Sequence, residues 1–433
     1  MTARRFLGTA LLATVLTVGV FAAVTTIVDP YDYWGRPRHE GLNARKPMVH
    51  THLTAVKQRQ YLRQKPRTVI AGNSRVDVGL NPGSALWPKE HGPVYNLGLP
   101  GASMTAVAEA LATAMAAHKP ERVFLGVDFL DFLLTRDRWA EQAIGPLRAQ
   151  PQGVSRQARQ LAETTLSLDA LIHSGLTVLE QRKTHPADTR PDGFTPLENY
   201  HDHVRMEGHA ALFEQRSREL VQRMLREPRR LDWNAADNNS TGDGNSTGGN
   251  MMWTRLEQFL HLAQEQGVEV VLFTYPYHAE LLETLRQTGK GPDLRQWLAR
   301  LAELAAREGV TLWSFTGYDE WSTEAVPPPG DRTTRMRWYW EAGHFKPALG
   351  ELMIARMLER PDAPAGFGQK LTPDRGEALT AALTAALAAG AEGYRVRPGT
   401  SSERVAAYVS EINGAEIAQA ELPEGKALTS GGM

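Results

Sequence analysis

The 433-residue sequence contains no cysteine. This absence excludes disulfide bonds, thiolate metal sites and a cysteine nucleophile. The chain also carries almost no net charge, because 48 Lys and Arg residues balance 49 Asp and Glu residues. Such a balance, with the basic residues scattered along the chain, gives no indication of nucleic-acid binding. The length fits either one α/β core with insertions and tails or two domains.

Long uncharged runs are scarce, and the one that stands out begins directly after Arg4-Arg5 and extends over residues 6–28. As a helix, these roughly 23 residues would span about 34 Å, enough to cross a bilayer. A secretory signal has a shorter apolar core, although Val20-Phe21-Ala22 is a passable cleavage site. The length favours an uncleaved single-pass anchor in a bacterial cytoplasmic membrane, with the arginines inside. With an anchor or a cleaved signal over 1–28, the main domain lies in the periplasm or outside.

After a connector over residues 29–66, short apolar strands alternate with helical patterns. The expected strands are 68–71, 94–97, 122–127, 269–274 and 311–315. The expected helices are 58–64, 105–118, 253–266, 278–287, 294–308 and 347–359. This alternation predicts a parallel sheet that is covered on both faces.

The alternation is interrupted between about residues 130 and 250, which we interpret as a helical insertion in a core domain over 67–360. Its clearer helical segments are 156–173 and 212–225, and it ends in an Asn/Gly/Ser/Thr-rich stretch expected to be a flexible loop, 234–250. Residues 361–433 form a carboxyl-terminal extension, with helices expected over 373–389 and 403–412.

Two distant stretches carry residue types suited to nucleophilic catalysis. Ser74 follows Gly72 directly after the first expected strand, where α/β hydrolytic folds present a nucleophile. His344 lies just before the last helix of the core and can act as the base, with Glu341 three residues earlier to orient it. Taken singly, each is commonly an ordinary turn or surface residue, and their joint placement is what predicts a Ser-His-acid site.

Further residues at the carboxyl ends of the strands are candidates for binding. Gly98 and Gly101 flank a proline after the second strand, so their backbone N–H groups can approach a ligand, or they form a plain turn. Arg75 can bind an anionic substrate group, or pair with Asp77 or Asp128. His278 can line the pocket, replace His344 as the base, or start a helix.

The stretch His201-Asp202-His203, with His209, invites a metal-site interpretation. No clear third ligand follows at helical spacing, so we favour a surface loop here and expect neither a metal nor a cofactor.

The motifs together resemble the SGNH (GDSL-like) hydrolase superfamily, in a membrane-anchored branch similar to the alginate O-acetylation proteins and the D-alanyl-lipoteichoic acid transfer protein. Gly72-Asn73-Ser74-Arg75 resembles the nucleophile block, and the run from Tyr95 to Ser103 resembles the glycine block. Glu341-Ala342-Gly343-His344-Phe345 resembles the closing Asp-x-x-His block. The resemblance covers about residues 67–360 and implies a three-layer, flavodoxin-like sheet.

Two positions depart from the family pattern. The closing acid is Glu341, where the family usually has Asp. Asp128 stands where the family block donates an Asn to the oxyanion hole, and an ionised carboxylate can only accept hydrogen bonds. The oxyanion donors would then be the backbone N–H groups of Ser74 and of Gly98 or Gly101, or a group from elsewhere. Loss of one such donor typically costs about a hundredfold in rate or more.

The resemblance and the expected anchor imply an O-acyltransferase, of O-acetyl groups in the first instance, or an esterase acting on a cell-surface or exported polysaccharide. By the same resemblance the partner would be a multi-span membrane acyltransferase that delivers the acyl group. The rival interpretation is a non-catalytic glycan-binding or scaffold subunit of an acylation complex, which the substituted oxyanion block favours. A free esterase that removes acyl groups is a further alternative.

Overall fold

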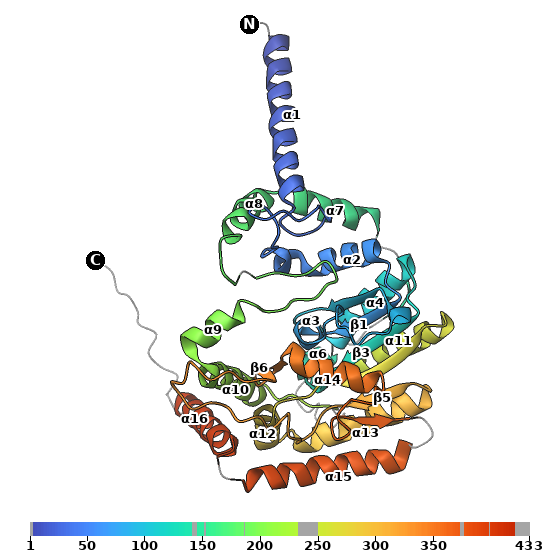
Figure 1. Ribbon diagram of the computed structural model, residues 1–433, viewed down its shortest axis with the longest axis vertical. Helices are drawn as coiled ribbons and strands as arrows, with labels where there is room; N and C mark the ends of the chain where they lie inside the picture. Colours follow the sequence, from blue (N-terminus) through green and yellow to red (C-terminus); the bar gives the residue numbers. More distant parts are fainter. Residues whose placement is uncertain are drawn as a thin grey trace, which may run out of the picture.

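The computed structural model describes residues 3–140, 145–150, 153–185, 187–232, 250–372, 376–397 and 399–420. Its centre is a six-stranded sheet in the order β2-β1-β3-β4-β5-β8 (Figure 1). The first five strands pair in parallel, and β8 pairs antiparallel with β5. The strands are β1 (Thr68–Gly72), β2 (Val94–Gly98), β3 (Arg122–Val127), β4 (Glu269–Thr274), β5 (Thr311–Ser314) and β8 (Gln369–Leu371). The predicted α/β class and mostly parallel sheet are therefore confirmed.

The sheet strands are buried on both sides. Every residue of β1 is buried, and only the first residue of β3 is partly exposed. Because successive residues of a strand point to opposite faces, complete burial means that both faces of these strands are covered. The apolar runs are therefore continuous rather than alternating, which is the pattern from which the parallel sheet was predicted.

Two groups of helices surround the sheet. In the first group, α4 (Met104–Ala117) packs on β1 and contacts α2 (Leu53–Gln64) and α11 (Met251–Glu265). In the second, α14 (Pro347–Met357) packs on the short helix α3 (Ser74–Gly79). The remaining elements outside the insertion are η1 (Val49–His52), η2 (Lys89–His91), α12 (Ala279–Gln287), α13 (Gly291–Arg307), β6 (Tyr339–Glu341), β7 (His344–Phe345), α15 (Gly376–Arg395) and α16 (Ser402–Ala420).

The carboxyl-terminal region contributes to the sheet as well as adding helices. The strand β8 lies beyond residue 360 and was not expected, because its three residues carry no strand periodicity. It pairs at the β5 edge, with Leu312 opposite Leu371. The helix α15 then packs on α13, which places this region against the core.

The interruption between β3 and β4 contains helices and no further strand of the central sheet among the residues that the structure describes. These are α5 (Phe129–Phe132), α6 (Arg136–Ala140), α7 (Val154–Thr165), α8 (Leu168–Glu180), α9 (Tyr200–Glu207) and α10 (His209–Arg226). The single helix expected over 156–173 was wrong: it is two helices, because Ser167 caps α8 by accepting the Ala170 N–H at 3.1 Å. Most of the expected flexible loop, residues 234–249, lies outside the described residues.

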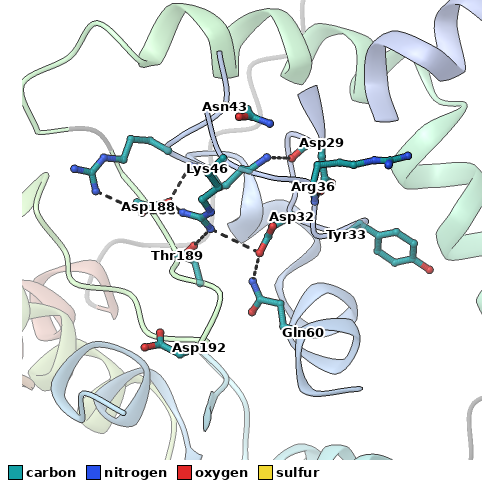
Figure 2. Close-up of polar contacts among 12 residues, drawn as sticks. Asp29, Asp32, Tyr33, Arg36, Asn43, Lys46, Gln60, Asp188, Thr189 and Asp192 are labelled. Atoms are coloured by element: carbon teal, nitrogen blue, oxygen red, sulfur yellow. Dashed lines mark hydrogen bonds and ion pairs between the residues drawn. The ribbon is translucent and has the colours of Figure 1, made fainter. Parts of the chain in front are cut away.

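The amino-terminal helix α1 (Ala3–Val28) projects from the rest of the molecule (Figure 1). The helix is long and apolar enough to cross a membrane, and a signal sequence near the amino terminus can have the same length and composition. Its carboxyl end is held by buried polar contacts, among which Lys46 Nζ donates to the carbonyl oxygens of Val28 and Asp29 at 2.9 and 2.7 Å (Figure 2).

Candidate active site

Ser74 is positioned by the junction of β1 and α3 at the carboxyl edge of the sheet. Asn73 caps α3, because its Oδ1 accepts the Arg75 N–H at 3.1 Å. Gly72, at the end of β1, has no space for a Cβ, since Tyr275 and Val76 fill the position. The short helix was not expected from the sequence, and it places Ser74 at the first helical position, half-buried at the edge of a cavity.

His344 and Glu341 reach Ser74 from the β6–β7 hairpin, in which Glu341 is paired with His344. The hairpin packs on α3: Phe345 lies so close to Gly79 that no Cβ would fit there. The Ser74 Oγ lies 2.8 Å from His344 Nε2, and His344 Nδ1 is hydrogen-bonded to Glu341 Oε1. The structure thus brings Ser74 together with His344, which lies 270 positions later in the chain, and with Glu341 beside it.

The carboxylate of Glu341 determines which ring nitrogen of His344 carries a proton. Burial raises the pKa of Glu341, but His344, Arg216 and the Gly343 N–H outweigh it and lower that pKa to about 2. The Gly343 N–H donates to Oε2 at 2.6 Å, and Arg216 Nε lies 3.8 Å from the same atom. Because an ionised carboxylate can only accept, His344 Nδ1 carries a proton and Nε2 is left to accept the Ser74 hydroxyl.

His209 stabilises β6, the strand that carries Glu341. It is fully buried at the start of α10, its Nδ1 donates to the Trp340 carbonyl at 3.1 Å, and its Nε2 accepts the Met336 N–H at 3.2 Å. The surface loop expected for this histidine group was therefore wrong for His209. Burial, followed by the charge of Lys346, lowers the pKa of His209 to about 4, which keeps the ring neutral and able to accept.

Arg75 and Asp128 contact each other rather than presenting free charges. The guanidinium forms a buried ion pair with Asp128 Oδ2 and lies over the rings of Tyr275 and Tyr277, 5.5 and 5.1 Å from their centroids. Asp128 also accepts from Tyr277 Oη and from Asn73 Nδ2. Of the alternatives open for Arg75, pairing with Asp128 is the one observed, and this pair anchors the nucleophile turn to the end of β3.

Gly98 is not a donor to a ligand in this arrangement. Its N–H donates to Asn96 Oδ1 at 2.8 Å, and a Cβ on Gly98 would collide with the backbone of Asp77. Gly98 therefore serves the close approach of α3 to β2. Gly101 differs, because it lines the cavity beside Ser74 and has a left-handed backbone conformation with φ +71°.

His278 is a helix cap. Its Nδ1 accepts the Glu280 N–H at 3.1 Å and its Nε2 donates to the Glu324 carbonyl at 2.8 Å. Burial lowers the pKa of His278 to about 4. Both ring nitrogens are engaged, so the helix-start alternative is the one the structure supports, and His344 is the histidine beside Ser74.

Ser74 opens into a cavity of about 240 Å³ that also touches Gly101, Ala102 and Ser103. Four further arginines line this cavity, namely Arg138, Arg216, Arg223 and Arg229. Its acidic residues are Asp128, which is paired with Arg75, and Asp131, whose pKa burial and Asp128 raise well above the usual range. Five arginines against two carboxylates make the cavity electropositive, so it attracts anions.

These arginines were missed at the level of sequence. Arg216 and Arg223 lie on α10 at a spacing of seven residues, which places both on one helix face. That spacing is a usable signal for a shared face. The sequence could not show that this helix face lies over Ser74, because that depends on how the insertion folds back across the sheet.

Comparison of the chain with protein-family models, with curated proteins and with solved structures finds no match.

Proposed function

We propose that this protein is an extracytoplasmic, membrane-anchored O-acyltransferase or esterase of SGNH type that acts on a cell-surface or exported polysaccharide. The observation that carries the proposal is the hydrogen-bonded series Ser74–His344–Glu341. A hydroxyl in contact with an imidazole that a carboxylate orients is the arrangement needed for an activated serine nucleophile.

The strand order supports the SGNH assignment. The parallel strands follow the order 2-1-3-4-5 of flavodoxin-like sheets, in which ligands bind at the carboxyl ends where the order reverses. Ser74 follows β1, and β1 lies between β2 and β3 at that reversal. The anchor is supported by α1, which is long and apolar enough to span a bilayer.

The proposed reaction has two steps. Ser74 Oγ attacks the acyl carbonyl carbon while its proton passes to His344 Nε2, and the C–O bond to the leaving alcohol breaks as His344 returns the proton to it. In the second step His344 removes a proton from a sugar hydroxyl or from water, whose oxygen attacks the acyl-Ser74 carbonyl. The bond from that carbonyl to Ser74 Oγ breaks, and His344 returns the proton to Oγ. Glu341 stabilises the imidazolium in both steps.

The developing oxyanion has backbone donors available. The N–H of Ser74, at the start of α3, has no acceptor within its own helix, and the Gly101 turn lies in the same cavity. Among the described cavity-lining residues, the only amide side chain is that of Asn73, which donates to Asp128. A site that lacks the amide donor of the family block is expected to turn over more slowly, by about 10² to 10³.

The electropositive cavity favours an acceptor with anionic groups, such as uronate or phosphate substituents on the polymer. Arginine side chains present planar forks that match carboxylate and phosphate oxygens. Acyl delivery by a multi-span membrane acyltransferase is part of the proposal through the family resemblance alone.

The test is hydrolysis of a chromogenic acetyl ester by the full-length protein in detergent, followed by mass spectrometry for an acetylated Ser74. We expect both signals to be lost in Ser74→Ala and the ester activity to be lost in His344→Ala. Ser155→Ala, an exposed position on α7, is the matched control and should behave as the parent. Equal background rates in all four proteins, with no acyl-enzyme, would remove the catalytic proposal.

The competing function is a non-catalytic glycan-binding subunit, and Asp128 at the oxyanion position is what favours it. In that case Ser74→Ala would leave binding of an anionic polysaccharide unchanged and no ester would be cleaved. Acyl transfer to an added oligosaccharide that exceeds transfer to water would separate the transferase from a free esterase.

A further inference from the structure

Exposed large apolar side chains are concentrated in one place outside α1. Among the described residues, ten such side chains are exposed beyond α1, and seven of them belong to α7, α8 and the turn between them. They are Val154, Leu161, Leu166, Leu168, Ile172, Leu176 and Leu179. Scattered exposed leucines need no explanation, but this concentration does.

The helix α8 has its apolar residues on the outside. Leu168, Ile172, Leu176 and Leu179 follow one another at intervals of four, four and three residues, which places them on one helix face. Their exposures are 67, 50, 38 and 60%. The buried face of the same helix carries the small residues Ala170, Ser174 and Thr177. This is the reverse of a helix on the surface of a water-soluble domain.

This outward face starts where α1 would leave a bilayer. A span of about 20 residues that begins at Phe6, directly after Arg4-Arg5, ends at Thr25. The residues of α1 from 3 to 20 are exposed, whereas Thr25 is buried and its Oγ1 donates to the Thr165 carbonyl at 2.8 Å. Thr165 is the last residue of α7, next to Leu166. Figure 1 shows α7 and α8 at the foot of α1, extending to either side of it.

The end of α1 is held against the connector and the segment that follows α8 by the polar contacts drawn in Figure 2. Lys46 is fully buried and donates to the carbonyls of Val28, the last residue of α1, and of Asp29, while its own N–H donates to Asp188 Oδ1 at 2.9 Å. Asp188 is also paired with Arg38 at 3.1 Å, and Asp32 accepts from Gln60 of α2 at 2.6 Å. The helix α1 also packs directly against α7 and α8, which places the two helices beside its end.

We propose that the α8 apolar face, made of Leu166, Leu168, Ile172, Leu176 and Leu179, lies in the membrane interface beside α1, with its side chains among the lipid acyl chains. Amphipathic helices lie in this plane when one face is apolar. The lipid bilayer is the occupant because the face continues from α1 at the level where the hydrocarbon ends. The domain would then contact the bilayer through two elements, which sets its height and orientation.

The proposal rests on the proposed anchor and is independent of the proposed acyl chemistry. The absence of cysteine allows a direct test with single-cysteine variants of the full-length protein carrying an environment-sensitive thiol-reactive fluorophore. Leu168→Cys, Ile172→Cys and Leu179→Cys report on the face, and Leu12→Cys reports on α1. Ala385→Cys is the matched control: it is exposed on α15, at the opposite end of the molecule from α1 (Figure 1).

Each labelled protein is reconstituted into vesicles of phosphatidylcholine and phosphatidylglycerol, with and without lipids that carry a quencher on the acyl chain. We expect blue-shifted emission and several-fold stronger lipid quenching at the three face positions and at Leu12→Cys than at Ala385→Cys. Quenching at Leu12→Cys with none at the face would overturn the proposal and leave the anchor intact. Face labels that aqueous iodide quenches as strongly as the Ala385→Cys label would also overturn it. Face labels that neither quencher reaches would show a second protein surface over the face instead of lipid.

Discussion

At the scale of single residues, the contacts around the acid of the site matter more than whether that acid is Asp or Glu. Glu341 replaces the shorter Asp of the family that the sequence resembles, yet its Oε1 is bonded to His344 Nδ1. The extra methylene is accommodated because Glu341 and His344 are opposed across a tight hairpin rather than adjacent on a loop. The Gly343 N–H and Arg216 keep the carboxylate ionised.

The first prediction concerns Glu341→Gln. The amide cannot hold the imidazole in the proton-bearing state that leaves Nε2 free to accept, so we expect kcat on an acetyl ester to fall by about 10² to 10⁴ with little change in KM. Glu341→Asp keeps the charge and should lose less. Steady-state kinetics of both variants decide this, and an unchanged kcat in Glu341→Gln would remove Glu341 from the proposed mechanism.

A second prediction concerns Arg223, which lines the cavity from α10. Its side chain is exposed, so the guanidinium is open to a ligand that enters the cavity. If the acceptor is anionic, Arg223→Gln should raise KM for an anionic oligosaccharide about 10-fold, near the lower end of a charge-assisted hydrogen bond of 1.5–3 kcal/mol. KM for a neutral acetyl ester should not change. Equal effects on both substrates would point to a structural role instead.

At the scale of elements, the β6–β7 hairpin depends on α10 of the insertion. His209, at the start of α10, accepts the Met336 N–H and donates to the Trp340 carbonyl beside Glu341. The insertion therefore stabilises the site and also supplies the four arginines that line the cavity beside Arg75. Protonation of His209 would remove the acceptor for Met336 and weaken this contact.

This contact gives a pH prediction. The pKa of His209 is about 4 in the folded protein and about 6.5 when unfolded, so the unfolded state binds more protons between these values. The contribution of His209 to the free energy of unfolding is therefore fully present above pH 6.5. It is lost as the pH falls to 4, by up to about 3 kcal/mol.

Chemical unfolding of the parent and of His209→Gln across this range measures the difference. The free energy of unfolding should fall less steeply with decreasing pH in the variant. His278, whose pKa is also about 4, contributes equally to both proteins. Parallel curves would contradict the assignment.

At the scale of the whole molecule, the junction between α1 and the α/β domain is a buried polar cluster (Figure 2). Lys46 has no exposed surface and donates to two carbonyls at the end of α1. A buried cluster of this kind is expensive to break once one partner is removed. It therefore ties the end of α1 to the connector, and through Asp32 and Gln60 to α2.

The corresponding prediction is that Lys46→Met loosens this junction. Two carbonyl acceptors lose their donor, which should cost about 2–4 kcal/mol and speed hydrogen exchange over residues 25–48. Arg45→Met is the matched control, because Arg45 is exposed and lies 3.6 Å from Asp188, and it should cost less than about 1 kcal/mol. Exchange unchanged in Lys46→Met would show that the junction is held by other contacts.

The sequence by itself determined where the main elements lie. Five strands were predicted within a residue of their observed ends, since each is a short apolar run bounded by Gly, Pro or charged residues, and the membrane-length helix follows from composition alone. It also singled out Ser74, Glu341 and His344, because each stands beside the end of an element. Such signals are local, and local backbone preference and burial decide them.

Only the tertiary structure decided which of these residues meet. The pairing of Arg75 with Asp128, the loss of the Gly98 N–H to Asn96, and the arginines over Ser74 all depend on how distant segments pack. The strand β8 likewise exists because β5 offers it an unpaired edge, although its own three residues have no strand signal. Side-chain partners are chosen by contacts across the fold, and periodicity along the chain carries no record of them.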